Sequence, residues 1–312
     1  MKIAIMGTGG MGAYYGGLLA SQGQDVQFIA RGEHLKALRA NGLQIKSIHG
    51  DLAVKSVQAT DKPSEIGPVD LVLFCTKTYH TDEAAKAILP VVGPKTTVVS
   101  LQNGIDAAER IGKVVGIGHL LAGATWISSF VESPGVIKQV STFRRVVVGE
   151  LDGIQSPRLQ AVYEAFKPTG IAIESSNTIL KVLWTKFVFI SAVSSFGSLT
   201  RLPMGDYRSV TETRTQILSL MQEVKALAEA VGVPLDSDVV EKSMKFIDDN
   251  LPHIKPSMQV DVENGRRTEI ESMIGVIGRK GREKGVPTPV ADLVFAALLP
   301  VELKAVSSPP GR

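Results

Sequence analysis

Short apolar runs alternate with amphipathic segments through the first half of the chain. Five apolar runs predict buried strands, at Lys2–Met6, Asp25–Ala30, Asp70–Cys75, Thr97–Leu101 and Leu120–Trp126. Helical spacing of apolar residues follows from Met11 to Ser21 and from Glu83 to Leu89. This alternation is typical of βαβ units and predicts a parallel, doubly wound α/β sheet.

The pattern then changes in two steps. Val136–Val140 and Arg145–Gly149 are close enough to predict an antiparallel hairpin that extends the sheet, followed by a helix over Ser156–Phe166 and a strand over Ile171–Ser175. Only helical patterns come later, at Val210–Val231, Asp238–Asn250, Thr268–Lys284 and Pro289–Glu302. We therefore predict an α/β domain over residues 1–176 and an all-α domain over residues 177–312, whose last residues, 307–312, fray.

The first predicted strand leads directly into a glycine-rich turn that opens a predicted helix. Its residues are Gly7, Thr8, Gly9, Gly10, Met11 and Gly12, which form a G-x-G-x-x-G motif. Gly7 permits a tight turn, Gly9 lets the backbone approach a pyrophosphate, and Gly12 lets the helix pack closely on the sheet. The diphosphate would lie on the free amides of the helix N-terminus. This predicts a Rossmann-type domain with a dinucleotide on these six residues; the alternative is a glycine-rich turn without a ligand.

The residue after the second strand distinguishes the two nicotinamide cofactors. A site for NAD carries an acidic residue there, which accepts a hydrogen bond from the ribose 2′-hydroxyl. This chain has Arg31, whose guanidinium can pair with a 2′-phosphate and stack on adenine. NADPH/NADP+ is therefore favoured over NAD. A solvated surface arginine is the alternative, and nearby Glu33 keeps NAD open.

Two more polar loops follow predicted strands at the carboxyl edge of the sheet, where open α/β sheets bind ligands. Lys77 follows one strand and would face a cofactor phosphate or a substrate carboxylate. Asn103 follows the next, and its amide could hold both the nicotinamide ribose and the substrate. A surface lysine and a plain Asn-Gly turn are the alternatives.

Composition narrows the partners. The 34 basic and 31 acidic residues give a net charge of +3, and no basic block suggests a nucleic-acid partner. The single cysteine, Cys75, excludes an internal disulfide and fits a cytoplasmic protein. The five histidines lack metal-ligand spacing, so we expect no metal, and we expect no membrane span. The predicted assembly is a monomer or a homodimer.

The order of these motifs resembles the ketopantoate reductase (2-dehydropantoate 2-reductase) family over nearly the full length of the chain. The resemblance rests on Gly7–Gly12, Arg31, Cys75-Thr76-Lys77, Gln102-Asn103-Gly104, Leu183-Trp184-Thr185-Lys186, Ser257 and Glu269. It implies a C-terminal domain like that of 6-phosphogluconate dehydrogenase. It also implies hydride transfer from NADPH to a branched 2-keto acid, here 2-dehydropantoate, giving (R)-pantoate for pantothenate synthesis.

The resemblance also implies roles for single residues. Lys186 would be the proton donor, Ser257 a substrate contact, and Asn103 a ligand of cofactor and substrate. Glu269 would contact the cofactor and support catalysis. The chemistry agrees, since an ammonium beside the carbonyl stabilises the developing alkoxide and then protonates it, and a neighbouring carboxylate keeps that ammonium charged.

The helix after the lysine departs from the family pattern. Asparagines are usual four and eight residues after the lysine, where this chain has Ile190 and Ser194. Ser194 still offers a hydroxyl to the substrate, but Ile190 offers none, and Ser191, Ser195 and Ser198 either compensate or only permit close packing. Reduction of a different 2-keto acid, a 3-hydroxy acid dehydrogenase activity and a non-catalytic NADP sensor therefore stay open.

Overall fold

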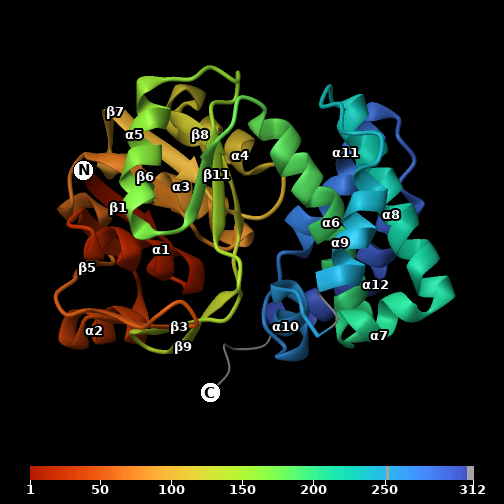
Figure 1. Cartoon of the computed structure of the whole chain (residues 1–312), viewed down its shortest axis with the longest axis horizontal. Helices are drawn as coiled ribbons and strands as arrows, with labels where there is room; N and C mark the ends of the chain where they lie inside the picture. Colours follow the sequence, from red (N-terminus) through yellow and green to blue (C-terminus); the bar gives the residue numbers. More distant parts are fainter. Residues whose placement is uncertain (251–252, 308–312) are drawn as a thin grey trace. The chain divides into compact units, whose positions relative to one another are not determined.

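The structure is a computed structural model that describes residues 1–250 and 253–307, so most of the tail expected to fray, residues 308–312, lies outside the described residues. The chain divides into two compact units (Figure 1). The N-terminal unit comprises Met1–Gln102 and Ala107–Ile179. The helical unit comprises Asn103–Asp106 and the chain from Leu180 onward. The expected domain boundary after residue 176 stays a prediction.

An eight-stranded sheet forms the centre of the N-terminal unit, in the order β12-β11-β8-β7-β6-β1-β2-β5. Its strands are β1 (Lys2–Met6), β2 (Asp25–Ile29), β5 (Gln58–Thr60), β6 (Val69–Phe74), β7 (Val92–Ser100), β8 (Leu120–Trp126), β11 (Arg145–Gly149) and β12 (Ala172–Ser175). All neighbours pair in parallel except β11 and β8. The predicted α/β fold with a mainly parallel sheet is confirmed.

Helices cover both faces of this sheet. They are α1 (Gly10–Ser21), α2 (Gly32–Asn41), α3 (Thr81–Ala87), α4 (Ala107–Val115) and α5 (Pro157–Phe166), with short 3₁₀ turns η1 (Pro63–Glu65), η2 (Thr78–His80), η3 (Leu89–Val91), η4 (Ile117–His119) and η5 (Lys167–Thr169). Residues of β1 alternate between two cores, because successive strand side chains point to opposite faces. Ile3 and Ile5 pack in the core under α1 and α5, whereas Ala4 and Met6 pack in the core under α3 and α4.

The predicted hairpin of Val136–Val140 with Arg145–Gly149 is wrong. β10 (Val136–Gln139) belongs instead to a second sheet, of order β4-β3-β10-β9, with β3 (Leu43–Ser47), β4 (Leu52–Val54) and β9 (Ser129–Ser133). The burial of the two strands explains the difference. Four consecutive residues of β11 are buried, which requires a strand covered on both faces, as in the main sheet, whereas buried and less buried positions alternate along β10.

Every regular element in the described part of the helical unit is a helix, which confirms the predicted all-α region. The elements are α6 (Ile179–Thr200), α7 (Met204–Ser209), α8 (Thr211–Ala230), α9 (Val239–Asn250), α10 (Ser257–Glu263), the π-helix η6 (Glu271–Gly275), α11 (Val276–Lys284) and α12 (Pro289–Ser307). One apolar core joins them. The helix predicted over Thr268–Lys284 begins later than expected, because the π-helix η6 precedes α11.

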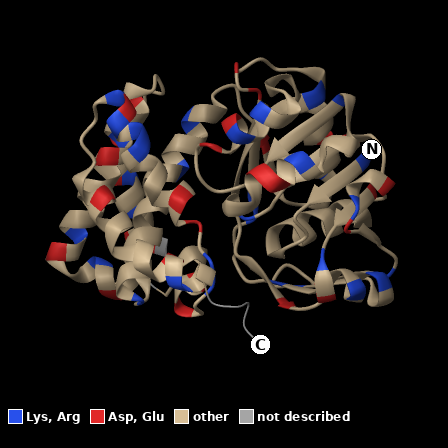
Figure 2. Ribbon diagram, turned by 180° about the vertical axis from the view of Figure 1, so that it is seen from behind, with Lys and Arg blue, Asp and Glu red and all other residues tan. Residues whose placement is uncertain are grey.

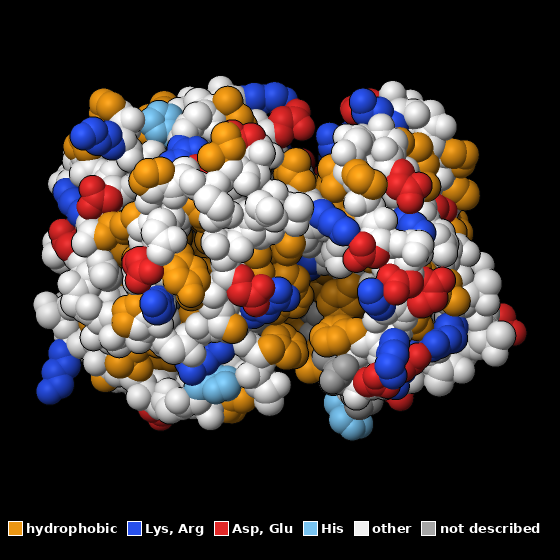
Figure 3. Space-filling view, turned by 45° about the horizontal axis from the view of Figure 1, so that its top comes forward, with side chains coloured by type: hydrophobic (Ala, Val, Ile, Leu, Met, Phe, Trp, Pro, Cys, Tyr) orange, Lys and Arg blue, Asp and Glu red, His pale blue; other side chains and the backbone are white. Residues whose placement is uncertain are grey.

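Helix α6 is long and apolar enough to cross a membrane by length and composition alone. Its burial is that of a core helix, because Trp184, Phe187, Val188, Ala192 and Val193 all pack in the core of the helical unit. Basic and acidic residues are interspersed along the ribbon of the helical unit (Figure 2). On the face of the molecule seen in Figure 3, basic and acidic side chains also lie among one another on each unit, as the nearly balanced composition leads one to expect.

Candidate active site and cofactor pocket

At Gly7 and Gly12, where β1 passes into α1, a side chain would collide with the backbone. Gly7 has a φ of +94°, and a Cβ there would lie 2.7 Å from the Thr76 backbone nitrogen. A Cβ on Gly12 would lie 2.2 Å from the Gly7 carbonyl oxygen and 3.0 Å from Cβ of Cys75. These contacts bring the start of α1 close against the ends of the neighbouring strands.

The middle of the same turn is open. A Cβ on Gly9 would meet no atom within 4 Å. Gly9 is the N-cap of α1 and supplies no side chain to the helix amides, which leaves the positive end of the helix available to an anion. The start of α1 thus leaves open space beside Gly9 and no side chain that caps its amides.

The other residues of the turn make packing contacts and a hydrogen bond within the N-terminal unit, and their predicted contact with the cofactor stays a prediction. A Cβ on Gly10 would lie 2.5 Å from the Ser129 carbonyl oxygen, because β9 passes directly over the start of α1. Thr8 is buried, and its hydroxyl donates to the Ile29 carbonyl oxygen over 2.9 Å. Met11 packs against the core under α1. In the structure Gly10, Thr8 and Met11 thus shape the turn through these packing contacts.

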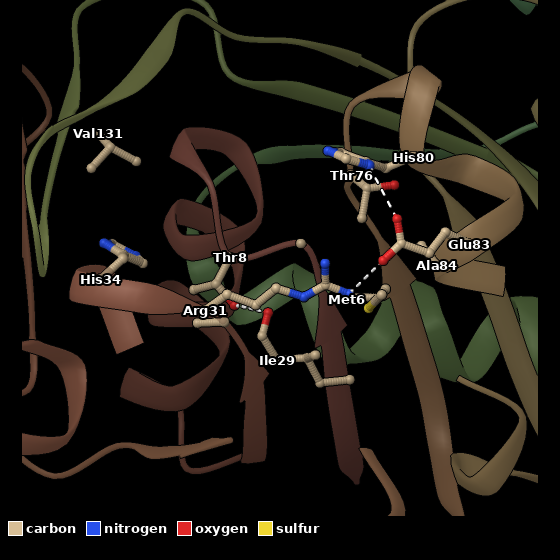
Figure 4. A pocket seen from close by; sticks show the side chains of 12 residues that line it. Met6, Thr8, Ile29, Arg31, His34, Thr76, His80, Glu83, Ala84 and Val131 are labelled. Carbon is tan, nitrogen blue, oxygen red and sulfur yellow. Dashed lines mark hydrogen bonds and ion pairs between the residues drawn. The ribbon is translucent and has the colours of Figure 1, made fainter. Parts of the chain in front are cut away.

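A cavity of about 310 Å³ opens beside this turn (Figure 4). Arg31, at the N-cap of α2, reaches across it to Glu83 of α3, with 3.0 Å between Nη2 and Oε1. His80 Nδ1 lies 3.5 Å from the other carboxylate oxygen of Glu83. The hydrogen bond from Arg31 lowers the pKa of Glu83 below its usual value. The lining residues are Met6, Gly7, Thr8, Ile29, Ala30, Arg31, His34, Thr76, His80, Glu83, Ala84 and Val131.

Sequence reasoning missed Glu83 and favoured Glu33 as the nearby acid. Glu33 instead pairs with Lys36 on α2, with 73% of its side chain exposed, and does not line the cavity. The signal for Glu83 was its position after β6. Strands β2 and β6 flank β1 in parallel, so the segments after them reach the same edge of the sheet as the glycine-rich turn.

The loops after β6 and β7 are held together at this edge. The side-chain amide of Gln102 donates to the Thr76 carbonyl oxygen and to the Thr81 hydroxyl, both over 2.9 Å. Lys77 lies between these partners as the partly buried N-cap of η2. The loop that carries Lys77 is therefore fixed in place, although Lys77 does not line the cavity.

A second polar centre lies within the helical unit. Lys186 of α6 donates a hydrogen bond to Asn103, with 2.8 Å between Nζ and Oδ1. Burial lowers the pKa of Lys186 to about 8, and the attraction of Glu269 opposes that shift. Asn103 is followed by Gly104, whose φ is +94° and whose Cβ would lie 3.0 Å from the Ser272 carbonyl oxygen. Glycine thus lets the Asn103 loop approach the segment before α11.

The segment that carries Glu269 is anchored from α12. The backbone amide and the hydroxyl of Thr268 both donate to one carboxylate oxygen of Glu302, over 2.8 and 2.7 Å. Glu269 is only 6% exposed, and its backbone carbonyl oxygen accepts from the Met273 amide over 2.9 Å, just before the π-helical turn. A buried carboxylate on a fixed segment therefore acts on the Lys186 ammonium.

The remaining predicted substrate contacts are less closely connected to this centre. Ser257 is the exposed first residue of α10. Ser194 is buried on α6, two helical turns beyond Lys186. Ile190 lies between them on α6 and packs against the apolar core. No hydrogen bond that the structure describes joins Ser257 or Ser194 to Lys186.

The other serines of α6 are mostly engaged with their own helix. Ser191 donates to the Phe187 carbonyl oxygen over 2.6 Å, and Ser195 donates to the Ser191 carbonyl oxygen over 2.7 Å. Ser198 is buried, and its hydroxyl has no hydrogen-bond partner among the described residues. The hydroxyl hydrogens of Ser191 and Ser195 are thus used within the helix, which leaves only their oxygens as acceptors.

Comparison with known proteins identifies the family. Residues 3–153 match the family described as ketopantoate reductase PanE/ApbA, and residues 178–302 match its C-terminal counterpart. The chain belongs to the ketopantoate reductase family. Ketopantoate reductases are NADP-dependent oxidoreductases, so the chain is an oxidoreductase of this kind, with the fold expected of it.

Individual ketopantoate reductase relatives cover almost the whole chain. An oxidoreductase of Bacillus subtilis, YkpB, is 28% identical over 96% of this chain and 98% of its own. The 2-dehydropantoate 2-reductase of Mesorhizobium japonicum is 29% identical over 95% of this chain and 96% of its own. A crystal structure of a family member from Ralstonia eutropha is 30% identical, covers 98% of this chain and 100% of its own, and superposes with a TM-score of 0.90.

Proposed function

We propose that this chain reduces the ketone of a 2-keto acid with NADPH, and that Lys186 donates the proton. The observation that carries the proposal is the Lys186 centre, in which an ammonium with a pKa near 8 is held by the Asn103 amide. A general acid works best when its pKa lies near the working pH, because it then is protonated and yet releases the proton readily.

The reaction balances with these groups. When bound, NADPH supplies a hydride to the ketone carbon. The carbon–oxygen π pair moves to the oxygen, which takes a proton from Lys186 Nζ, and the neutral amine then recovers a proton from water. Asn103 accepts from Lys186 through Oδ1 and keeps its amide hydrogens for the substrate or the nicotinamide ribose. Glu269 favours the charged form of Lys186 before the transfer.

The remaining contacts follow from the placement of the cofactor. Arg31 would hold the 2′-phosphate, and the open turn at Gly9 would hold the diphosphate. Lys77 would face a phosphate or the substrate carboxylate, and Glu269 would contact the cofactor as well as Lys186. Ser257 and Ser194 would contact the substrate. 2-Dehydropantoate is the first candidate, with (R)-pantoate as its product in pantothenate synthesis.

A more apolar 2-keto acid is the second candidate. It is favoured by Ile190, which can bond no hydroxyl, and by the internal hydrogen bonds of Ser191 and Ser195. A site that lacks donors for a substrate hydroxyl loses discrimination for it. Ile190→Asn should therefore raise kcat/KM for 2-dehydropantoate relative to an unhydroxylated branched 2-keto acid by about tenfold.

The test is the initial rate of NADPH oxidation with 2-dehydropantoate and a panel of branched 2-keto acids. A kcat/KM for 2-dehydropantoate well above the rest supports the pantothenate assignment. A preference for an unhydroxylated acid supports the second candidate. Tight NADPH binding without turnover of any 2-keto acid contradicts both.

A further inference from the structure

The charge beside the glycine-rich turn is already neutralised within the cavity. Among the side chains that line it, Arg31 carries the one permanent positive charge and Glu83 the one carboxylate. His34 also lines the cavity, and its pKa is lowered by burial, so it is neutral near pH 7. An arginine meant only for a phosphate dianion gains nothing from a carboxylate 3.0 Å away, because the two anions then repel each other.

This pair offers a partner to an adenosine ribose with a 2′-hydroxyl and to one with a 2′-phosphate. Figure 4 shows the Arg31 side chain extended across the cavity, with its guanidinium against Glu83 and with His80 on the far side of that carboxylate. Arg31 lowers the pKa of Glu83, so the carboxylate is ionised and only accepts hydrogen bonds. A ribose 2′-hydroxyl can donate to it, in the way that an acid at the end of the second strand serves in sites for NAD. A 2′-phosphate instead competes with Glu83 for the guanidinium.

We propose that Glu83 is a second determinant of cofactor choice, which lets the Arg31 pocket accept NADH and limits its preference for NADPH. The proposal rests on the cofactor placement given above. Glu83 comes from α3, which follows β6, and acts where an acid after the second strand is usual. Arg31, which follows β2, and Glu83, which follows β6, would thus both contact the substituent on the 2′ position of the ribose.

The experiment measures binding of two fragments that lack the nicotinamide. Adenosine 2′,5′-bisphosphate and adenosine 5′-monophosphate are titrated by calorimetry into the full-length protein and into Glu83→Gln. Removal of the carboxylate charge should raise the ratio of the two affinities, in favour of the bisphosphate, by about fivefold. Glu33→Gln is the matched control, since it removes the same charge from a side chain nearby that pairs with Lys36 outside the cavity.

The outcomes separate this proposal from the cofactor placement. If the wild-type protein binds neither fragment, the placement itself is wrong. If it binds the bisphosphate and Glu83→Gln leaves the ratio unchanged, Glu83 forms only a surface ion pair with Arg31. An equal shift in Glu33→Gln also overturns the proposal, because the effect is then one of overall charge. A thermal melt of each variant checks that the fold is retained.

Discussion

The two polar centres of this protein hold a cation in opposite ways. Arg31 is exposed over 63% of its side chain and pairs with a carboxylate. Lys186 is partly buried and pairs with the neutral amide of Asn103, and its pKa falls to about 8. A guanidinium does not deprotonate in proteins, whereas a desolvated ammonium does so readily. The first centre is therefore suited to binding an anion and the second to giving up a proton.

Removal of the proton donor should have the largest effect. Lys186→Ala is expected to lower kcat by at least tenfold and by up to about 10⁴-fold, the range of general acid catalysis, while NADPH affinity is nearly kept. Steady-state rates together with fluorescence titration of NADPH check both. Lys181→Ala is the matched control, because Lys181 lies on the same helix and pairs with Asp236 instead. Equal losses in the two variants would remove Lys186 from its proposed role.

The lowered pKa of Lys186 should make the rate of keto acid reduction depend on pH. Only the protonated lysine can act as the acid, so kcat/KM for keto acid reduction should be constant below about pH 8 and fall tenfold per unit above it. Oxidation of the hydroxy acid needs the neutral amine and should rise through the same pH. Rate profiles in both directions measure this. A reduction profile that stays flat to pH 10 would contradict the assignment.

The exposed centre should respond through affinity alone. Arg31→Ala is expected to weaken NADPH by about 10-fold to 100-fold, the value of one or two charge-assisted hydrogen bonds, and to change NADH affinity far less. Cofactor titration at fixed ionic strength checks the difference. Equal weakening of the two cofactors would show that Arg31 does not contact the 2′-phosphate.

Adjacent glycines separate ligand binding from folding. Gly10→Ala should lower the free energy of unfolding by about 1–3 kcal/mol, because its Cβ meets the backbone of β9. Gly9→Ala should leave the stability nearly unchanged and weaken the dinucleotide, because its Cβ enters open space beside the start of α1. Thermal melts with and without NADPH distinguish the two. Unchanged NADPH affinity in Gly9→Ala would place the diphosphate elsewhere.

The sequence was informative where one local pattern decides the structure. The strand, glycine-rich turn and helix from Lys2 to Ser21 follow from periodicity and three glycines, and the structure has them as expected. The predicted hairpin failed because apolar runs do not specify their partners, and β9, which pairs with β10 in the second sheet, has no buried residue to reveal it. Two charged residues that line the cavity, Arg31 and Glu83, are 52 residues apart in the sequence. The parallel pairing of β2 and β6 with β1 brings them together, and local patterns in the sequence do not show this.

The short segment Asn103–Asp106 has a consequence for dissecting the protein. It is grouped with the helical unit although residues on both sides of it belong to the N-terminal unit, so the chain passes from one unit to the other three times. A fragment that begins at residue 180 would therefore lack Asn103 and the hydrogen bond that Asn103 accepts from Lys186. Chimeras that exchange cofactor halves between relatives would need to carry this tetrapeptide with the helices rather than with the sheet.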